Sequence, residues 1–198
     1  MSLHRPIRLA LFWLALAPIS VLAHDAGGEH ASHTLGFVGG LLHPLSGVDH
    51  WTAMLMVGFW SALAAQRRWI APLAFAAVML VGAVLGRAGV GLPAVEPMIA
   101  ASLLVFGLLV AYRLVLPSLV AAGLVGLFAL FHGVAHGQEL APTGAAWQTL
   151  LGMLLTTVAL HLFGLALGVR LSHRSRLWPA LIGSGVAGLG TYWLLQSV

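Results

Sequence analysis

Long apolar segments separated by short polar connections make up most of the chain beyond its first 34 residues. A helix needs about 20 apolar residues to cross the ~30 Å hydrocarbon core of a bilayer. Cutting the sequence at its charges, prolines and glycines gives six such segments, approximately Leu35 to Ala65, Ile70 to Leu85, Ala94 to Tyr112, Pro117 to Gly137, Ala145 to Val169 and Trp178 to Leu195. The pattern therefore predicts an all-α, polytopic membrane protein with six transmembrane helices.

The first apolar segment is too long for one straight span, and it contains Pro44 and Gly47. Proline removes a backbone hydrogen bond and crowds the preceding helical turn. We therefore expect this span to be broken near Pro44 and to continue as an intact helix from about Val48. Irregular backbone at membrane depth is tolerated where it lines a cavity, so the break is a candidate part of a site.

The first 23 residues have the three parts of a secretory signal peptide. Arg5 and Arg8 form the basic start, an apolar run follows, and the small residues Val21 and Ala23 occupy the positions that a signal peptidase reads. We predict cleavage after Ala23, which gives a signal peptide over 1–23, a periplasmic tail over 24–34 and a six-helix domain over 35–198. An uncleaved first transmembrane helix is the alternative.

The composition agrees with a membrane protein and explains the basic charge. Hydrophobic residues make up 60% of the chain and charged residues 7%, against roughly 25% charged residues in an ordinary soluble domain. All nine basic residues are arginine and the net charge is +4. With the mature N-terminus outside, the predicted cytoplasmic loops contain Arg67, Arg68, Arg113, Arg170, Arg174 and Arg176. This positive-inside pattern predicts a multi-pass protein of the bacterial inner membrane with both termini periplasmic, and it leaves no reason to expect a nucleic-acid partner.

Glycines four residues apart recur in the predicted spans. The pairs are Gly36 and Gly40, Gly82 and Gly86, and Gly164 and Gly168. This spacing permits close approach of two helices, so we interpret these glycines as packing positions.

Ionisable side chains concentrate at two places within the apolar segments. One is the run from His43 to His50, and the other is the run from His132 to Glu139. Such groups are costly in hydrocarbon unless they are paired, hydrated or hold an ion. The predicted topology puts both runs in the outer half of the membrane, where they could meet. The candidate metal ligands are His43, Asp49, His50, His132, His136 and Glu139.

The second run has the spacing of a ligand face. His132, His136 and Glu139 are four and then three residues apart, so on a helix they project from one side. Neutral imidazoles one turn apart can bind one divalent cation, and a carboxylate adds an oxygen donor. The chain has no cysteine, so thiolate ligands are excluded and a borderline ion such as Ni²⁺, Co²⁺, Zn²⁺ or Cu²⁺ is favoured.

Further histidines are secondary candidates for metal binding. His24, His30 and His33 lie in the predicted periplasmic tail, which could collect metal and pass it inward, although a plain solvated linker accounts for them equally well. His161 lies in the inner half of the fifth segment with Thr157 one turn before it. It is either hydrogen-bonded within the bundle or a relay on an exit path.

Two other classes of protein use similar residues. Histidines with a carboxylate can hold a catalytic zinc, which would give an intramembrane zinc-dependent hydrolase, but the HExxH pattern of zinc proteases is absent. A haem protein would need axial histidines on facing helices, for which His50 and His132 are candidates.

The short predicted loops leave no room for a soluble catalytic or nucleotide-binding domain, and no P-loop pattern is present.

The motifs HPLSGVDHW and FHGVAHGQE, behind a signal sequence that ends in Ala-His, resemble those of the HupE/UreJ family of bacterial nickel permeases. The resemblance covers essentially the whole predicted mature chain. It implies a non-enzymatic secondary transporter for Ni²⁺, or for Co²⁺ or another divalent transition metal, without a prosthetic group. It also implies that the six motif residues are the metal site, and it makes downstream nickel-enzyme maturation proteins candidate partners. The lipid bilayer is the other expected partner, and the sequence indicates no oligomeric state.

Overall fold

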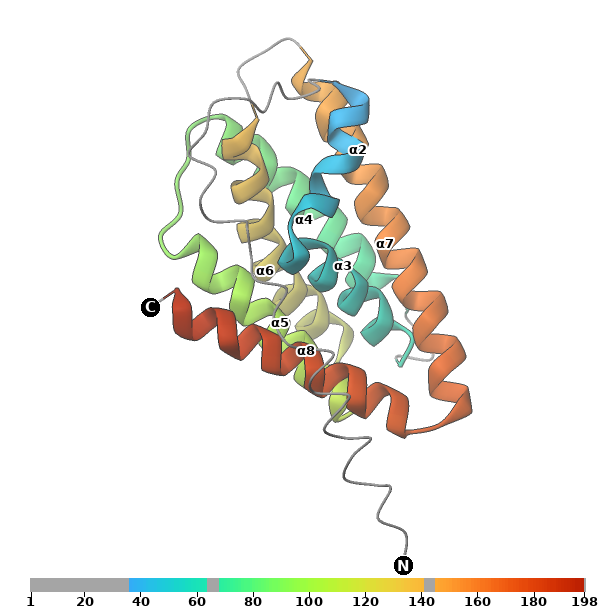
Figure 1. Cartoon of the computed structure of the whole chain (residues 1–198). Helices are drawn as coiled ribbons and strands as arrows, with labels where there is room; N and C mark the ends of the chain where they lie inside the picture. Colours follow the sequence, from blue (N-terminus) through green and yellow to red (C-terminus); the bar gives the residue numbers. More distant parts are fainter. Residues whose placement is uncertain (1–35, 64–67, 141–144, 198) are drawn as a thin grey trace, which may run out of the picture. The chain divides into compact units, whose positions relative to one another are not determined.

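A computed structural model describes residues 36–63, 68–140 and 145–197. These residues form seven α-helices, which confirms the all-α class (Figure 1). Every described residue belongs to one compact unit, Thr34–Val198. The predicted signal peptide, its cleavage site and the tail over 24–34 lie outside the described residues. The helices are α2 (Phe37–Ser46), α3 (Val48–Ser61), α4 (Ile70–Arg87), α5 (Val95–Ala111), α6 (Ser118–Glu139), α7 (Ala146–Arg174) and α8 (Leu177–Gln196).

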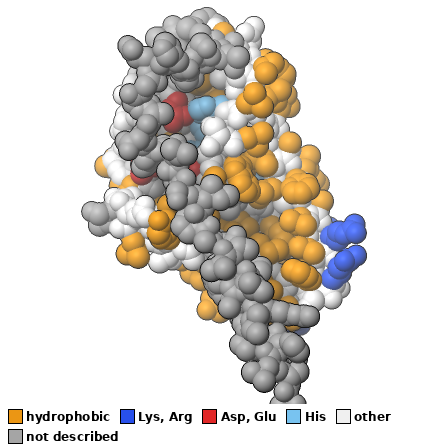
Figure 2. Space-filling view, in the orientation of Figure 1, with side chains coloured by type: hydrophobic (Ala, Val, Ile, Leu, Met, Phe, Trp, Pro, Cys, Tyr) orange, Lys and Arg blue, Asp and Glu red, His pale blue; other side chains and the backbone are white. Residues whose placement is uncertain are grey.

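Three of these helices, α4, α6 and α7, are long and apolar enough to cross a membrane. Large apolar side chains stand on their outer faces, and Leu73, Leu119 and Phe163 are 65%, 86% and 62% exposed. Apolar side chains are expected to face outward where the surroundings are lipid, and Figure 2 shows them over much of one face. For the other helices the six-span arrangement stays a prediction.

The first predicted span is interrupted near Pro44, as expected, and the break falls at Gly47. Pro44 lies inside α2, Gly47 has an extended backbone (φ −98°, ψ 117°), and α3 begins at Val48 as expected. A Cβ atom at residue 47 would lie 2.8 Å from the Asp49 Oδ1 and 2.9 Å from the His50 Nδ1. Glycine at this position therefore leaves space for the Asp49 and His50 side chains at the start of α3.

Three pairs of helices have the most extensive contacts: α4 with α6, α5 with α8, and α3 with α7. Glycines let the backbones approach within each pair. A Cβ atom at Gly82 or Gly86 would overlap the backbone of α6, and one at Gly164 would overlap the carbonyl of Leu55 on α3. Gly36 differs from the prediction, since it precedes α2 with φ +121° and its Cβ position is near only the Gln148 side chain.

The hydrophobic core lies where α3, α4, α5 and α6 meet. Its largest fully buried side chains include Phe59, Phe75, Phe106 and Met54. The Phe106 ring packs edge to face against Phe128, with the ring centroids 5.4 Å apart. This dense apolar packing fixes the helices that carry most of the polar residues of the two sequence motifs.

Candidate metal centre

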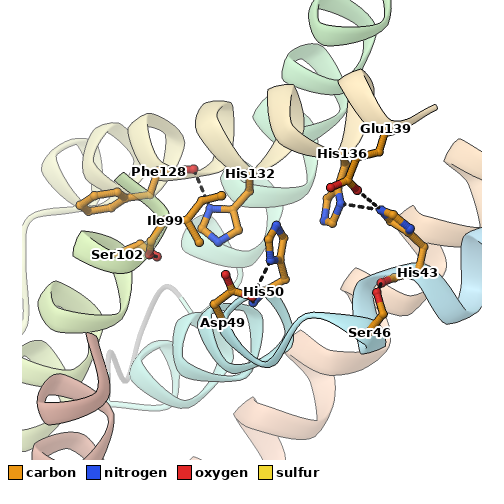
Figure 3. A network of polar contacts seen from close by, with 10 residues as sticks. All are labelled: His43, Ser46, Asp49, His50, Ile99, Ser102, Phe128, His132, His136 and Glu139. Atoms are coloured by element: carbon orange, nitrogen blue, oxygen red, sulfur yellow. Dashed lines mark hydrogen bonds and ion pairs between the residues drawn. The ribbon is translucent and has the colours of Figure 1, made fainter. Parts of the chain in front are cut away.

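Four histidines from three helices lie in one row (Figure 3). The His43 ring contacts that of His136, His136 contacts His50, and His50 contacts His132, with centroid separations of 4.9, 4.6 and 5.3 Å. His43 comes from α2, His50 from the first turn of α3, and His132 and His136 from successive turns of α6. The expected meeting of the two sequence motifs is therefore present in the structure.

Glu139 lies beside the end of the row that is formed by His43 and His136. The His43 Nε2 is 2.7 Å from the Glu139 Oε2 and 3.1 Å from the His136 Nδ1. One ligand atom from each of these three residues lies within 4.8 Å of the other two. The Glu139 side chain is 59% exposed, whereas His136 is buried. A single proton on the His43 Nε2 can form a full hydrogen bond to only one of its two neighbours, His136 or Glu139. A divalent cation, in contrast, can be coordinated by one ligand atom from each of the three residues.

Asp49 forms a pair with His50. The His50 ring donates its Nδ1–H to the Asp49 Oδ1 at 2.8 Å, and the same oxygen accepts the backbone N–H of His50 at 2.8 Å. Histidines that bind metals usually donate their second ring nitrogen to a carboxylate, carbonyl or water, which fixes the ring and its tautomer. The pair therefore leaves the His50 Nε2 available as a ligand atom, with Asp49 placed behind the ring.

His132 is fully buried at the other end of the row. Its Nδ1 lies 2.9 Å from the Phe128 carbonyl oxygen, so Nδ1 carries the proton and Nε2 carries a lone pair. Within the described residues neither the His132 Nε2 nor the His136 Nε2 has a hydrogen-bond partner. Buried polar atoms without a protein partner are rare in native proteins, and a bound ion is one of the groups that can satisfy them.

Each histidine on α6 is followed by a glycine that packs against α4. A Cβ atom at Gly133 would overlap the Met79 carbonyl, and one at Gly137 would overlap the Ala83 carbonyl. One face of α6 thus presents the imidazoles while a neighbouring face is held against another backbone. These two glycines were not predicted as packing positions, although their spacing of four residues matches the spacing of the histidines and could have revealed them.

The secondary candidates are not part of the row as described. His161 is buried on α7 and contacts the Phe75 ring, while His24, His30 and His33 lie outside the described residues. Glu96 was not predicted. It lies in the first turn of α5, and its charge acts on His50. Its signal was visible in the sequence, since it is one of only five acidic residues and stands at the predicted outer end of a span.

The geometry argues against the haem alternative. The His50 and His132 rings contact each other edge to face at 5.3 Å. Axial ligands of a haem lie on opposite sides of the macrocycle, and two rings in direct contact leave no space for it.

Fold and site together define a helical membrane protein with buried imidazoles and nearby carboxylates. Residues 12–193 match the family model described as HupE / UreJ protein, and the chain belongs to this family, which is a family of nickel and cobalt transporters. The chain is 42% identical over 184 residues to the curated Protein HupE of Rhizobium leguminosarum bv. viciae, and the match covers 92% of this chain and 95% of that protein. No solved structure matches the chain significantly. The family resemblance drawn from the two motifs is thereby confirmed.

Proposed function

We propose that this protein is a secondary transporter that takes up a divalent transition metal across the bacterial inner membrane, with Ni²⁺ as the first candidate and Co²⁺ as the second. The observation that carries this proposal is the unbroken row of four histidines from α2, α3 and α6. The family supports the same class of cargo. It also favours transport over the zinc-dependent hydrolase.

The difference in exposure between the two ends of the row supports entry from the Glu139 end. Exposed Glu139 and half-buried His43 would receive the ion together with buried His136, and the ion would then pass to His50 and to fully buried His132. The imidazoles would replace the water that the ion loses, and the Glu139 and Asp49 carboxylates would offset its charge. The tail histidines His24, His30 and His33 would supply additional donors before this step.

The proposed membrane orientation has the histidine row in the outer half and most arginines inside. In Figure 2 acidic and histidine side chains gather near one end of the bundle, while arginines gather near the end of α7 that leads into α8. Arg170 and Arg174 are exposed there. The separation of charges follows the positive-inside rule. Counting α2 and α3 as one interrupted span gives six spans and periplasmic ends for the mature chain.

The donor set favours borderline metals and does not by itself select nickel. Imidazole and carboxylate suit Ni²⁺, Co²⁺, Zn²⁺ and Cu²⁺, and Cu²⁺ is intrinsically the tightest of these. Selectivity must then come from the geometry of the row and from metal availability. Ni²⁺ and Co²⁺ are therefore the ions to compare first.

Whole-cell uptake of radioactive Ni²⁺ and Co²⁺ tests the proposal in a host that lacks other transporters for these ions. We expect His50→Ala and His136→Ala to abolish uptake at normal membrane abundance, because each change removes an imidazole from the centre of the row. His173→Ala is the matched control, since His173 is exposed at the end of α7 and should transport like the wild type. Normal uptake by both row variants would refute the proposed site.

A further inference from the structure

His161 is a buried histidine that the proposed entry site does not use. It lies on α7 and is 3% exposed. The Thr157 backbone, one turn earlier, lies close enough to act as a weak hydrogen-bond partner of the ring, but neither ring nitrogen has a hydrogen bond of good geometry within the described residues. A buried ionisable side chain without a well-formed hydrogen bond is costly at membrane depth, and a bound ion would satisfy it.

The Phe75 ring contacts both His161 and the histidine row. Phe75 is on α4 and is fully buried. Its ring centroid is 5.5 Å from that of His132 and 5.1 Å from that of His161, with interplanar angles of 62° and 66°. One phenyl ring thus touches the most buried imidazole of the row and the imidazole on α7.

Thr157, one turn before His161 on α7, links this position to α4. Its hydroxyl donates a hydrogen bond to the Met79 Sδ at 3.6 Å, and Met79 is one turn beyond Phe75. Thr157 is fully buried. The backbone of α3 also approaches closely, since a Cβ atom at Gly58 would overlap the His161 carbonyl. An imidazole suits a borderline transition metal better than it suits Mg²⁺ or Ca²⁺.

We propose that His161 is a second, inner binding position for the transported ion and that the Phe75 ring is the gate between it and His132. The inference rests on the proposed function. The ring closes the path in this conformation, because a phenyl group offers no lone pair and cannot replace the water that the ion has lost. Rotation of the Phe75 side chain would bring the His132 and His161 nitrogens onto one continuous path.

Entry of Ni²⁺ into proteoliposomes loaded with a metal-quenched dye tests the gate. We expect Phe75→Ala to increase passive Ni²⁺ entry by about tenfold, as expected when a small barrier is removed, while the affinity of the outer row stays within about twofold of the wild type. Phe106→Ala is the matched control, because Phe106 is equally buried but packs against Phe128 rather than a histidine. Equal leakage from both variants would show that lost packing, and not a gate, is responsible.

A second substitution keeps the gate testable if the alanine variant folds poorly. Phe75→Trp keeps an aromatic ring at this position but makes it larger. It should therefore slow Ni²⁺ entry while leaving equilibrium Ni²⁺ binding intact. Wild-type entry rates through Phe75→Trp, at wild-type thermal stability, would overturn the assignment of this residue.

Equilibrium dialysis against ⁶³Ni²⁺ tests the inner position. A gate changes the rate at which the ion reaches His161 but not its equilibrium occupancy, so Phe75→Ala should bind as many Ni²⁺ ions as the wild type, whereas His161→Ala, alone or combined with Phe75→Ala, should bind one fewer. His161→Ala alone should reduce uptake by about tenfold, the lower range for groups that support a metal site, without weakening the outer row. Identical stoichiometry in all variants would refute the inner position.

These outcomes separate the two proposals. A wild-type protein that binds no Ni²⁺ would refute the proposed function itself. A wild type that binds and transports Ni²⁺, with Phe75 and His161 variants that behave like Phe106→Ala, would refute only the gate and the inner position.

Discussion

Glycines bring the helix backbones into close contact in both the α4–α6 pair and the α5–α8 pair, but only the first pair carries the candidate metal ligands. Gly133 and Gly137 press α6 against the backbone of α4, and Gly183 and Gly190 press α8 against the backbone of α5. Only α6 also carries histidines and a carboxylate, whereas α8 contains no histidine, acidic residue or arginine. The difference shows that close approach alone makes no site. A site arises where a tightly held helix also presents ligand side chains.

The tightness of the α4–α6 contact should then control the metal site as well as stability. Gly137→Ala would drive a methyl group into the Ala83 carbonyl, and we expect α6 to shift and separate His136 from His43. Since partners outside the ligand shell are already worth 10–100-fold in affinity, Ni²⁺ affinity should fall by more than about 100-fold. Isothermal titration calorimetry of the purified protein measures this change.

The α5–α8 pair supplies the control for that experiment. Gly183→Ala would similarly overlap the Ala111 backbone, so both variants should lose stability by about 1–3 kcal/mol, the usual cost of overpacking. Only Gly137→Ala should lose affinity. Gly185→Ala has open space around its Cβ position and should change neither property adversely. A large loss of Ni²⁺ affinity in Gly183→Ala would show that the metal site depends on the packing of the α5–α8 pair as well as on that of the α4–α6 pair.

A smaller effect is expected from the carboxylate behind His50. Asp49→Asn keeps the size of the side chain but weakens the hold on the His50 Nδ1–H, so the ring loses its fixed tautomer. Ni²⁺ affinity should fall by about 10–100-fold, the range for such supporting groups, with no change in helix content by circular dichroism. An affinity equal to the wild type would mean that His50 is positioned by its packing alone.

The smallest effect should come from Glu96, which acts on the site from the exposed first turn of α5. Glu96→Gln should weaken Ni²⁺ binding by about twofold to fivefold, as expected for an exposed charge. Raising the ionic strength should reduce the difference between this variant and the wild type, because salt screens exposed charges. A difference that does not respond to salt would point to a direct contact instead.

Much of the fold followed from the apolar segments. α4 begins at Ile70 as predicted, and α6 and α7 begin within one residue of the expected positions. The C-terminal ends were less accurate, since α7 continues to Arg174 rather than to Val169. Hydropathy marks where a chain leaves hydrocarbon, but helical hydrogen bonds continue into polar surroundings.

The meeting of the two motifs could be predicted because the spacing on α6 identifies one helical face and because ionisable residues are rare in the apolar segments. The order of the four histidines in the row could not be predicted. His43 contacts His136 rather than His50 because Gly47 turns the chain between α2 and α3, and no periodic pattern indicates that turn. The position of Phe75 between two histidines also depends on three different helices, so its sequence gives no signal beyond that of a core residue.

The interruption at Gly47 puts His43 and His50 on two separate rigid rods. Under the proposed function, an ion held between residues of these two helices would link them, and its release would remove that link, so occupancy of the site would change how firmly α2 is joined to α3.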